Sequence, residues 1–211
     1  MNKLYTPYIK ENWQNYKWKN SAFYLLGLRG IIAGHTEEEE LLLQQFVSGR
    51  ESIVEIGIAE GASALELRRF ASPKATLYLI DPFLTAKRFP FINFTKLVAN
   101  RHANLSQNAK VEWLYDYSFN VSKDWNKSID FLFIDGDHSY EGCYQDWIEW
   151  SPYIVKGGVV AFHDARVFEG GWTDENTGSV RVINQLFRDV NQSDWKIVDE
   201  VKSLVIVQRV I

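Results

Sequence analysis

The sequence is poor in cysteine, in proline and in long apolar stretches. Cys143 is the only cysteine among 211 residues, so no disulfide bond can form within the chain. The five prolines are not part of any Pro-, Gly- or Ser-rich linker, which favours one domain over two tethered ones. No apolar run approaches the roughly 18 residues that a membrane-spanning helix needs, and residues 1–7 lack the apolar core of a signal peptide. These absences predict a cytoplasmic protein with no membrane partner.

An excess of positive charge is also missing. The chain carries 23 Lys and Arg against 27 Asp and Glu, a net charge of −4, and its pI is about 5.6. A nucleic-acid partner usually requires a basic surface, so we expect no nucleic-acid partner. Aromatic residues are plentiful at 15%. Those in residues 5–24 could form an interface between copies of the chain or fold over a pocket, which leaves a homo-oligomer open.

The first 50 residues are expected to form a helical extension of the same domain, with helix over most of residues 7–49. Thr36 is followed directly by four glutamates, Glu37 to Glu40. This pattern is typical of a helix start with a capping box and an acidic first turn. We expect these four glutamates to form a solvated helix end.

From residue 51 onward, short apolar runs alternate with helical stretches. The candidate strands are residues 52–57, 76–81, 110–116, 129–135 and 157–163, and the candidate helices are residues 62–71, 92–103, 140–152 and 179–190. Two final apolar runs, Trp195 to Val198 and Ser203 to Val210, have no helix between them, and Asp199 to Lys202 resembles a hairpin turn. This order predicts an α/β fold, Rossmann-like and doubly wound, with a mostly parallel seven-stranded sheet that ends in an antiparallel hairpin.

A glycine bend follows the first of these strands. Gly57 ends the apolar run and Gly61 comes four positions later, directly before a helical stretch. Such a strand–turn–helix unit lets the backbone approach a ligand and aims helix N–H groups at its polar end. Asp81 ends the second strand, 24 residues after Gly57, where a carboxylate can accept both hydroxyl hydrogens of a ribose. Glu55 lies inside the first strand, where a charge is costly without partners. Together these residues predict a nucleoside-cofactor site.

Ionisable residues also end the later strands. Asp116 follows the third strand, Asp135 the fourth, and His163 with Asp164 the fifth. Because ligands bind at the carboxyl ends of parallel strands, we expect these groups at one edge of the sheet. Asp135, His163 and Asp164 could converge to hold a divalent cation. The alternative is that such residues are turns and helix caps, with Asp137 or Ser139 capping the helix that begins near residue 140.

Several motifs together are typical of one enzyme family: the glycine loop from Glu55 to Ser63, the run Phe133 to Gly142 with its Ile-Asp-Gly-Asp-His motif, Asp146, and the run Lys156 to Asp164. In these residues the chain resembles class I S-adenosylmethionine-dependent methyltransferases, over roughly residues 51–210. Within that family it looks like the small-molecule O-methyltransferase group. The resemblance implies methyl transfer from S-adenosylmethionine to a hydroxyl of a sugar or natural product.

The resemblance also assigns roles to residues. Cofactor-binding residues would be Glu55, Gly57, Glu60, Gly61, Ser63, Asp81, Asp116, Tyr117 and Asp135, with Asp81 on the ribose and Asp116 and Tyr117 beside the adenine. Related catechol- and sugar-O-methyltransferases hold Mg²⁺ where this chain has Asp135 and Asp164, and His163 replaces an acidic residue there. Mg²⁺ or another divalent cation is therefore a candidate, and His138 or His163 could be the general base.

Three other functions are compatible with the same sheet. A nicotinamide-dependent oxidoreductase is disfavoured because the third glycine of its fingerprint is missing. A metal-dependent hydrolase would use Asp135, His138, His163 and Asp164. A cofactor-binding module would keep the fold without catalysis. For the methyltransferase function, the glycine-containing loop from Arg166 to Ser179, which follows the fifth strand, is a candidate mobile lid beside the acceptor.

Overall fold

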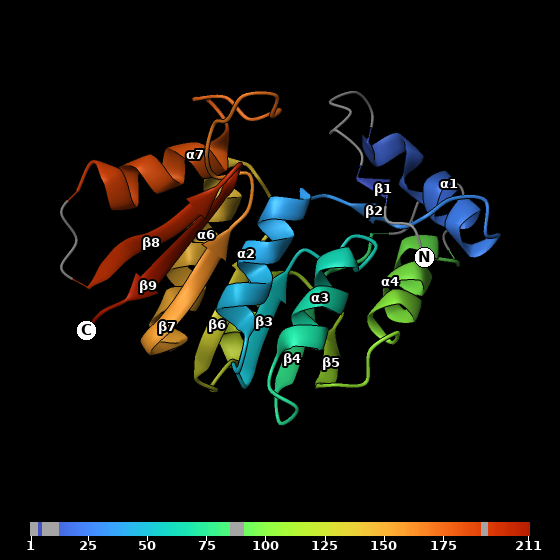
Figure 1. Cartoon of the computed structure of the whole chain (residues 1–211), viewed down its shortest axis with the longest axis horizontal. Coiled ribbons are helices and arrows are strands. Elements are labelled where there is room, and N and C mark those ends of the chain that lie inside the picture. Colours follow the sequence, from blue (N-terminus) through green and yellow to red (C-terminus); the bar gives the residue numbers. More distant parts are fainter. Residues whose placement is uncertain (1–3, 6–12, 85–90, 191–193) are drawn as a thin grey trace.

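A twisted seven-stranded sheet forms the centre of the molecule (Figure 1). The computed structural model describes residues 4–5, 13–84, 91–190 and 194–211. The sheet order is β5-β4-β3-β6-β7-β9-β8. The strands are β3 (Ser52–Ile56), β4 (Thr76–Ile80), β5 (Lys110–Leu114), β6 (Ile129–Ile134), β7 (Ile154–Phe162), β8 (Trp195–Val201) and β9 (Leu204–Arg209).

The topology confirms the predicted doubly wound fold. Strands β3 to β7 pair in parallel, and β9 pairs antiparallel with both β7 and β8. The chain starts in the middle with β3, moves outward to β5 and then returns to β6 on the other side of β3. This reversal places a crevice between β3 and β6, at the point where ligands bind in open α/β sheets.

The predicted position of the hairpin turn is wrong. Strand β8 continues through Asp199 and Glu200 to Val201, and Lys202 and Ser203 make the turn, with a positive φ of 51° at Lys202. An edge strand tolerates polar residues because one of its sides lies open to solvent, so the acidic pair belongs to the strand.

Helices cover both faces of the sheet (Figure 1). The helices that follow the glycine bend and the strands are α3 (Ala62–Phe70), α4 (Phe94–Ala103), α5 (Ser118–Val121), α6 (Tyr140–Trp150) and α7 (Gly178–Ile183), and a π-helical turn (Asn184–Arg188) extends α7. The predicted helices therefore lie where they were expected, with ends that differ by one to a few residues.

Strand residues alternate between two buried clusters. Ile53 and Phe131 face one side of the sheet, where they meet Leu43 of the N-terminal helix α2 (Glu37–Val47). Val54 and Leu132, one residue further on, face the other side, where the tryptophans of α6 pack. Burial on both faces explains why these strands are almost wholly apolar in sequence.

The N-terminal region is only partly helical. Helix α1 (Trp13–Leu25) packs against α4, but a short strand β2 (Ile32–Ala33) separates it from α2 and pairs in parallel with β1 (Leu4–Tyr5). The prediction of helix over residues 7–49 is therefore wrong at β2, and its part over residues 7–12 lies outside the described residues. Among the described helices, none combines the length and hydropathy required to cross a bilayer.

Candidate active site

The glycine bend lies directly against the end of the neighbouring strand β6. Gly57 has a φ of +87°, and a Cβ atom there would lie 2.2 Å from the carbonyl oxygen of Asp135 and 2.7 Å from Cα of Gly136. The amide of Asp135 donates to the Ile56 carbonyl over 2.9 Å. Only glycine combines this φ with this approach. The bend thus brings Asp135 beside the loop that leads into α3.

One carboxyl oxygen of Glu55 has no hydrogen-bond donor among the residues that the structure describes. Its side chain is fully buried in β3, and Ser63 Oγ at the start of α3 donates to Oε1. Oε2 has no hydrogen-bond partner among the residues that the structure describes. Burial raises the pKa of Glu55 well above its ordinary value, although the bond from Ser63 opposes the shift. An unsatisfied buried carboxyl oxygen beside a glycine bend leaves an acceptor that a ligand group could use.

Asp81 ties the glycine loop to the end of β4. Its Oδ2 accepts from the amides of Ile58 (2.9 Å) and Ala59 (3.3 Å), and its Oδ1 accepts from the amide of Phe83 at 2.7 Å. The half-buried carboxylate lies at the sheet edge, as expected for a ribose ligand, and it also shapes the loop.

Asp116 and Tyr117 follow β5 and are exposed at the same edge. Asn120 Nδ2 and the Tyr117 amide donate to Asp116 Oδ1 at 2.9 and 2.7 Å, and these bonds lower the pKa of Asp116. The structure leaves both side chains accessible, and their role beside an adenine stays a prediction.

Glu60 faces away from this group of residues. Its buried carboxylate accepts from Ser21 Oγ (2.9 Å) and from the Ile32 amide (3.2 Å), and it forms an ion pair with Arg29. These partners all belong to the N-terminal region, so the geometry favours a structural role for Glu60 over the predicted cofactor contact.

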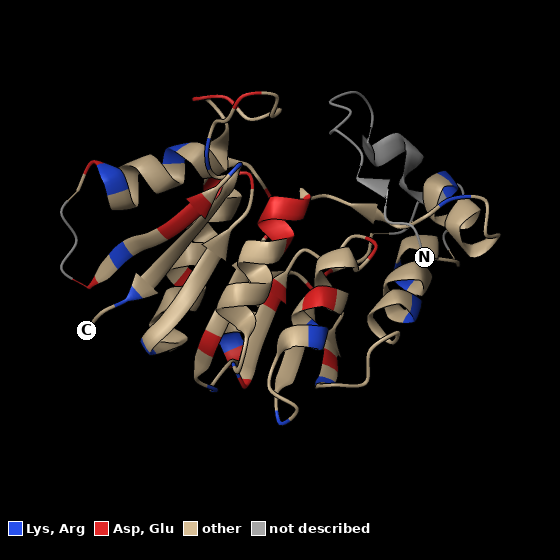
Figure 2. Cartoon of the chain, viewed as in Figure 1, with Lys and Arg blue, Asp and Glu red and all other residues tan. Residues whose placement is uncertain are grey.

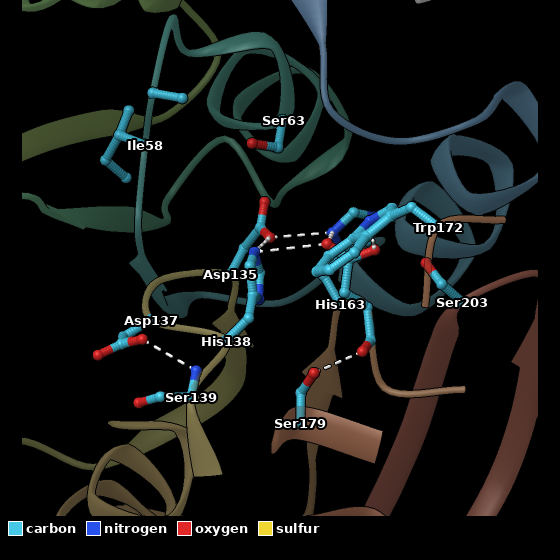
Figure 3. A network of polar contacts seen from close by, with 12 residues as sticks. Ile58, Ser63, Asp135, Asp137, His138, Ser139, His163, Trp172, Ser179 and Ser203 are labelled. Carbon is cyan, nitrogen blue, oxygen red and sulfur yellow. Dashed lines mark hydrogen bonds and ion pairs between the residues drawn. The ribbon is translucent and has the colours of Figure 1, made fainter. Parts of the chain in front are cut away.

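Two histidines and two aspartates meet where β6 and β7 end (Figure 3). Asp135 Oδ1 lies 2.9 Å from His163 Nδ1 and 3.9 Å from His138 Nε2. Asp164 Oδ2 lies 3.4 Å from each of these histidine nitrogens. The structure thus brings together all four residues of the predicted cluster.

The two histidines differ in exposure and in surroundings. The His138 side chain is 27% exposed, whereas that of His163 is 3% exposed. Burial lowers the pKa of His163, but the carboxylates of Asp164 and Asp135 raise it well above its ordinary value. For Asp164 the effects are opposite in sign. Burial raises its pKa, but the nearby His163 lowers it by more, so the pKa of Asp164 lies below its ordinary value. His163 is therefore the buried ring between carboxylates that favour its charged form, and His138 is the more exposed of the two rings.

A divalent cation would be held by His138 in place of the predicted His163. Asp135, His138 and Asp164 each offer one ligand atom, and these atoms lie within 4.8 Å of one another. His138 reaches the cluster because the chain turns sharply after β6: Asp137 accepts from the Ser139 amide at 2.9 Å, and Ser139 caps α6. Capping by Ser139 was among the alternatives drawn from the sequence.

The sequence missed Glu39. Figure 2 shows the acidic start of α2, where Thr36 and Glu39 form the predicted capping box. Glu37 and Glu38 are exposed, but Glu39 is 1% exposed and Glu40 is also buried, so the prediction of a solvated end is wrong for half of the run. Glu39 Oε1 accepts from the amide (2.8 Å) and Oγ (2.6 Å) of Ser203, and Oε2 lies 3.6 Å from His163 Nε2.

The charge on Glu39 should make the fold sensitive to acid. Burial raises the pKa of Glu39, but His163, Ser203 and the Thr36 amide lower it to about 2 from an ordinary 4.5. The unfolded chain binds this proton first as pH falls, so the contribution of Glu39 is complete above about pH 4.5 and is lost towards pH 2. We expect urea unfolding to show a difference in stability between the wild type and Glu39→Gln, on the order of 3 kcal/mol at pH 6, which narrows at pH 3. A difference that is the same at both pH values would contradict the assignment.

The loop after β7 closes over the cluster. Trp172 Nε1 donates to Asp164 Oδ1 at 2.9 Å, and the indole ring meets the His138 ring edge-on at 5.7 Å between centroids. Asp164 has a φ of +51°, and its carbonyl accepts from Ser179 Oγ. The loop is thus anchored on the residue that follows His163, and mobility of this loop stays a prediction.

Comparison with known protein families matches residues 54–165 to the family described as a methyltransferase domain. The chain belongs to this methyltransferase family. A curated relative, the uncharacterised protein R132 of Acanthamoeba polyphaga mimivirus, is 29% identical over 157 residues, which cover 74% of this chain and 68% of that protein.

Solved methyltransferase structures share the fold at low identity. The O-methyltransferase TomG from Streptomyces achromogenes, in complex with SAM, superposes with a TM-score of 0.64 at 15% identity, over 96% of this chain and 92% of that one. The O-methyltransferase from Bacillus cereus, in complex with SAH, gives 0.59 at 18% identity, over 92% and 89%. A putative rRNA-methylase from Clostridium thermocellum gives 0.58 at 14% identity, over 82% and 96%.

The matched segment of this methyltransferase contains most of the site. Glu55, Gly57, Asp81, His138 and Asp164 all fall within residues 54–165. Glu39 and Trp172, which contact the cluster from the N-terminal helix and from the loop after β7, lie outside it.

Proposed function

We propose that this methyltransferase transfers the methyl group of S-adenosylmethionine to a hydroxyl group of a small molecule. The observation that carries the proposal is the position of the His138, Asp135 and Asp164 cluster beside the glycine bend at Gly57, at one crevice of the sheet. TomG and the Bacillus cereus enzyme, which are named as O-methyltransferases and crystallised with SAM or SAH, support the donor and the acceptor class.

The residues of the crevice fit the donor. Glu55 Oε2 is a buried, unsatisfied oxygen beside Ser63, and it could bind the amino end of the methionine part. Asp81 could accept the ribose hydroxyls in addition to the loop amides that it holds. A carboxylate-rich edge also favours the positive sulfonium.

His138 is the better general base of the two histidines. Methyl transfer to oxygen is an in-line displacement, so the protein has to align donor and acceptor and remove the acceptor proton. The His138 side chain is 27% exposed, and its Nε2 lies 3.4 Å from Asp164 Oδ2, which would stabilise the imidazolium that forms. His163 is 3% exposed and its Nδ1 faces Asp135 Oδ1 at 2.9 Å, and the carboxylates around it raise its pKa, so it is poorly placed to take a proton from the acceptor.

Asp135, His138 and Asp164 would hold a divalent cation if one binds. Such an ion would supply a Lewis acid that lowers the pKa of the acceptor hydroxyl. His138 Nε2 cannot bind a cation and accept a proton at once, so the two roles exclude each other.

The test is methyl transfer from labelled S-adenosylmethionine to a panel of sugars, phenols and other hydroxylated small molecules, with and without EDTA. Transfer to a hydroxyl is the expected result. Ribosomal RNA belongs in the panel because the Clostridium thermocellum neighbour is titled a putative rRNA-methylase. Labelling of RNA with no small molecule methylated would overturn the acceptor class, although the net charge of −4 disfavours that outcome.

Replacing Asp81 by alanine should weaken binding of S-adenosylhomocysteine by about 1.5 to 3 kcal/mol, the range for hydrogen bonds to a charged group. Isothermal titration calorimetry measures this directly. The matched control is Asp130→Ala, because Asp130 accepts from the amides of Glu51 (2.9 Å) and Ser52 (3.1 Å) at the opposite end of β3. Equal affinity in the Asp81 variant would remove this carboxylate from the cofactor site.

A further inference from the structure

We propose that Glu39 is a positioning residue for methyl transfer, which holds the His163 ring from the side opposite Asp135. The proposal rests on the proposed function, because the centre that it orders is the cluster of Asp135, His138 and Asp164. Glu39 comes from α2, outside the segment that the methyltransferase family matches.

The buried carboxylate of Glu39 is held in place by several hydrogen bonds. Burying a carboxylate is costly unless hydrogen bonds and charges compensate it. Here Oε2 accepts from the Thr36 amide at 2.7 Å, and Oε1 accepts twice from Ser203. One bond comes from the start of the same helix and two come from the β8–β9 turn. Together they fix the carboxylate in one orientation, with Oε2 towards His163.

His163 needs such a partner. Its Nδ1 lies 2.9 Å from Asp135 Oδ1, while Nε2 is buried and makes no hydrogen bond among the described residues. The oxygen facing Nε2 is Glu39 Oε2 at 3.6 Å, which is an electrostatic contact that a small ring movement would turn into a hydrogen bond. With carboxylates at both nitrogens, the ring cannot flip without placing a carbon atom against each.

The consequence reaches the accessible groups of the centre. Asp135 Oδ1 is shared between His163 Nδ1 and His138 Nε2, and Asp164 Oδ2 contacts both rings. If His163 tilts, Asp135 loses its hydrogen-bond partner and Asp164 Oδ2 loses one of its two contacts, while Trp172 still holds Oδ1. The two carboxylate oxygens that contact His138 would then no longer be held in place. Glu39 therefore joins the start of α2 and the β8–β9 turn to the chemistry at the ends of β6 and β7.

Three variants separate positioning from stability. Glu39→Gln removes the charge while keeping the size of the side chain. Glu38→Gln changes the preceding glutamate, which is exposed and paired with Lys202. Thr36→Ala removes the hydroxyl that caps the helix, which lowers stability but leaves the Glu39 carboxylate in place.

We expect Glu39→Gln to lower kcat by about 10- to 100-fold, the effect seen when an outer partner of a site histidine is removed. KM for S-adenosylmethionine should stay within about twofold of the wild type, and so should calorimetric affinity for S-adenosylhomocysteine. Glu38→Gln and Thr36→Ala should keep wild-type kcat. An unchanged kcat in folded Glu39→Gln, or an equal loss in Thr36→Ala, would overturn the proposal.

A second readout does not depend on activity or on a variant that folds. In the ¹⁵N-labelled wild-type protein, NMR should show an Nε2–H signal from the His163 ring that exchanges slowly with solvent, because this hydrogen is buried between Glu39 and the sheet. The absence of that signal would overturn the positioning role. Its presence in a protein that methylates nothing would leave the positioning contact intact and refute only the proposed function.

Discussion

Replacing Gly57 by alanine should abolish binding of S-adenosylhomocysteine and lower the free energy of unfolding by about 2 to 5 kcal/mol. The new Cβ atom would lie 2.2 Å from the Asp135 carbonyl oxygen and 2.6 Å from its carbon, and both are backbone atoms that cannot rotate away. Relief requires β3 and β6 to separate at the crevice, which moves Asp135 and the glycine loop together. Urea unfolding and calorimetry would measure the two effects.

Gly49→Ala is the matched control for this change. Gly49 also has a positive φ, 76°, but a Cβ atom there meets nothing within 4 Å. Its cost is limited to backbone strain of about 1 to 2 kcal/mol, and its cofactor affinity should equal that of the wild type. If Gly57→Ala behaves like Gly49→Ala, the close approach of the bend to β6 has no functional role.

Much of the site could be predicted because the sheet itself collects it. Parallel strands place all their carboxyl ends at one edge, so Gly57, Asp81 and Asp135 are brought together by strand order and not by fine packing. Glu55 was recognisable for a different reason, since a carboxylate inside a buried strand needs a partner or a ligand. These inferences use local patterns together with one rule of topology.

Glu39 could not be predicted because its surroundings are not local. The capping box with Thr36 distinguishes Glu39 from the other three glutamates in sequence, but it does not show that Glu39 is buried against Ser203 and His163. Ser203, which binds Glu39, is 164 residues away along the chain. Helix periodicity could indicate that one side of the run is buried, but it does not identify the polar residues that contact this side.

The choice between His138 and His163 was also beyond the sequence. Both follow buried strands and both are next to an aspartate. Their exposure depends on the turn at Asp137 and Ser139, which returns His138 to the cluster, and on the position of α2, which covers His163. Polar residues in β8 were misread for a related reason, because whether a strand lies at an edge is a property of the whole sheet.

Replacing His138 by glutamine should lower kcat by about 10²- to 10⁴-fold, the contribution of a positioned acid or base. Affinity for S-adenosylhomocysteine should not change, because His138 contacts the acidic cluster and Trp172 and not the glycine bend. Steady-state kinetics and calorimetry on the same preparation separate the two quantities. The control is Asp137→Asn, an exposed neighbour that lies apart from the cluster (Figure 3) and whose amide oxygen can still accept from the Ser139 amide that forms the turn. A His138 variant with wild-type kcat would exclude both of its proposed roles.

The same variant decides between proton transfer and cation binding, because both need the lone pair of Nε2. If His138 is the base, EDTA leaves the wild type active and added imidazole restores part of the lost rate in His138→Gln. If His138 binds a cation, EDTA abolishes activity in the wild type, and calorimetry with Mg²⁺ or Mn²⁺ shows heat of binding that disappears in His138→Gln and in Asp164→Asn. Asn tolerates the positive φ of 51° at position 164, so that second variant removes a ligand charge without straining the backbone. Three carboxylates, those of Glu39, Asp135 and Asp164, face the one ring of His163, and their negative charge would attract a cation if one binds.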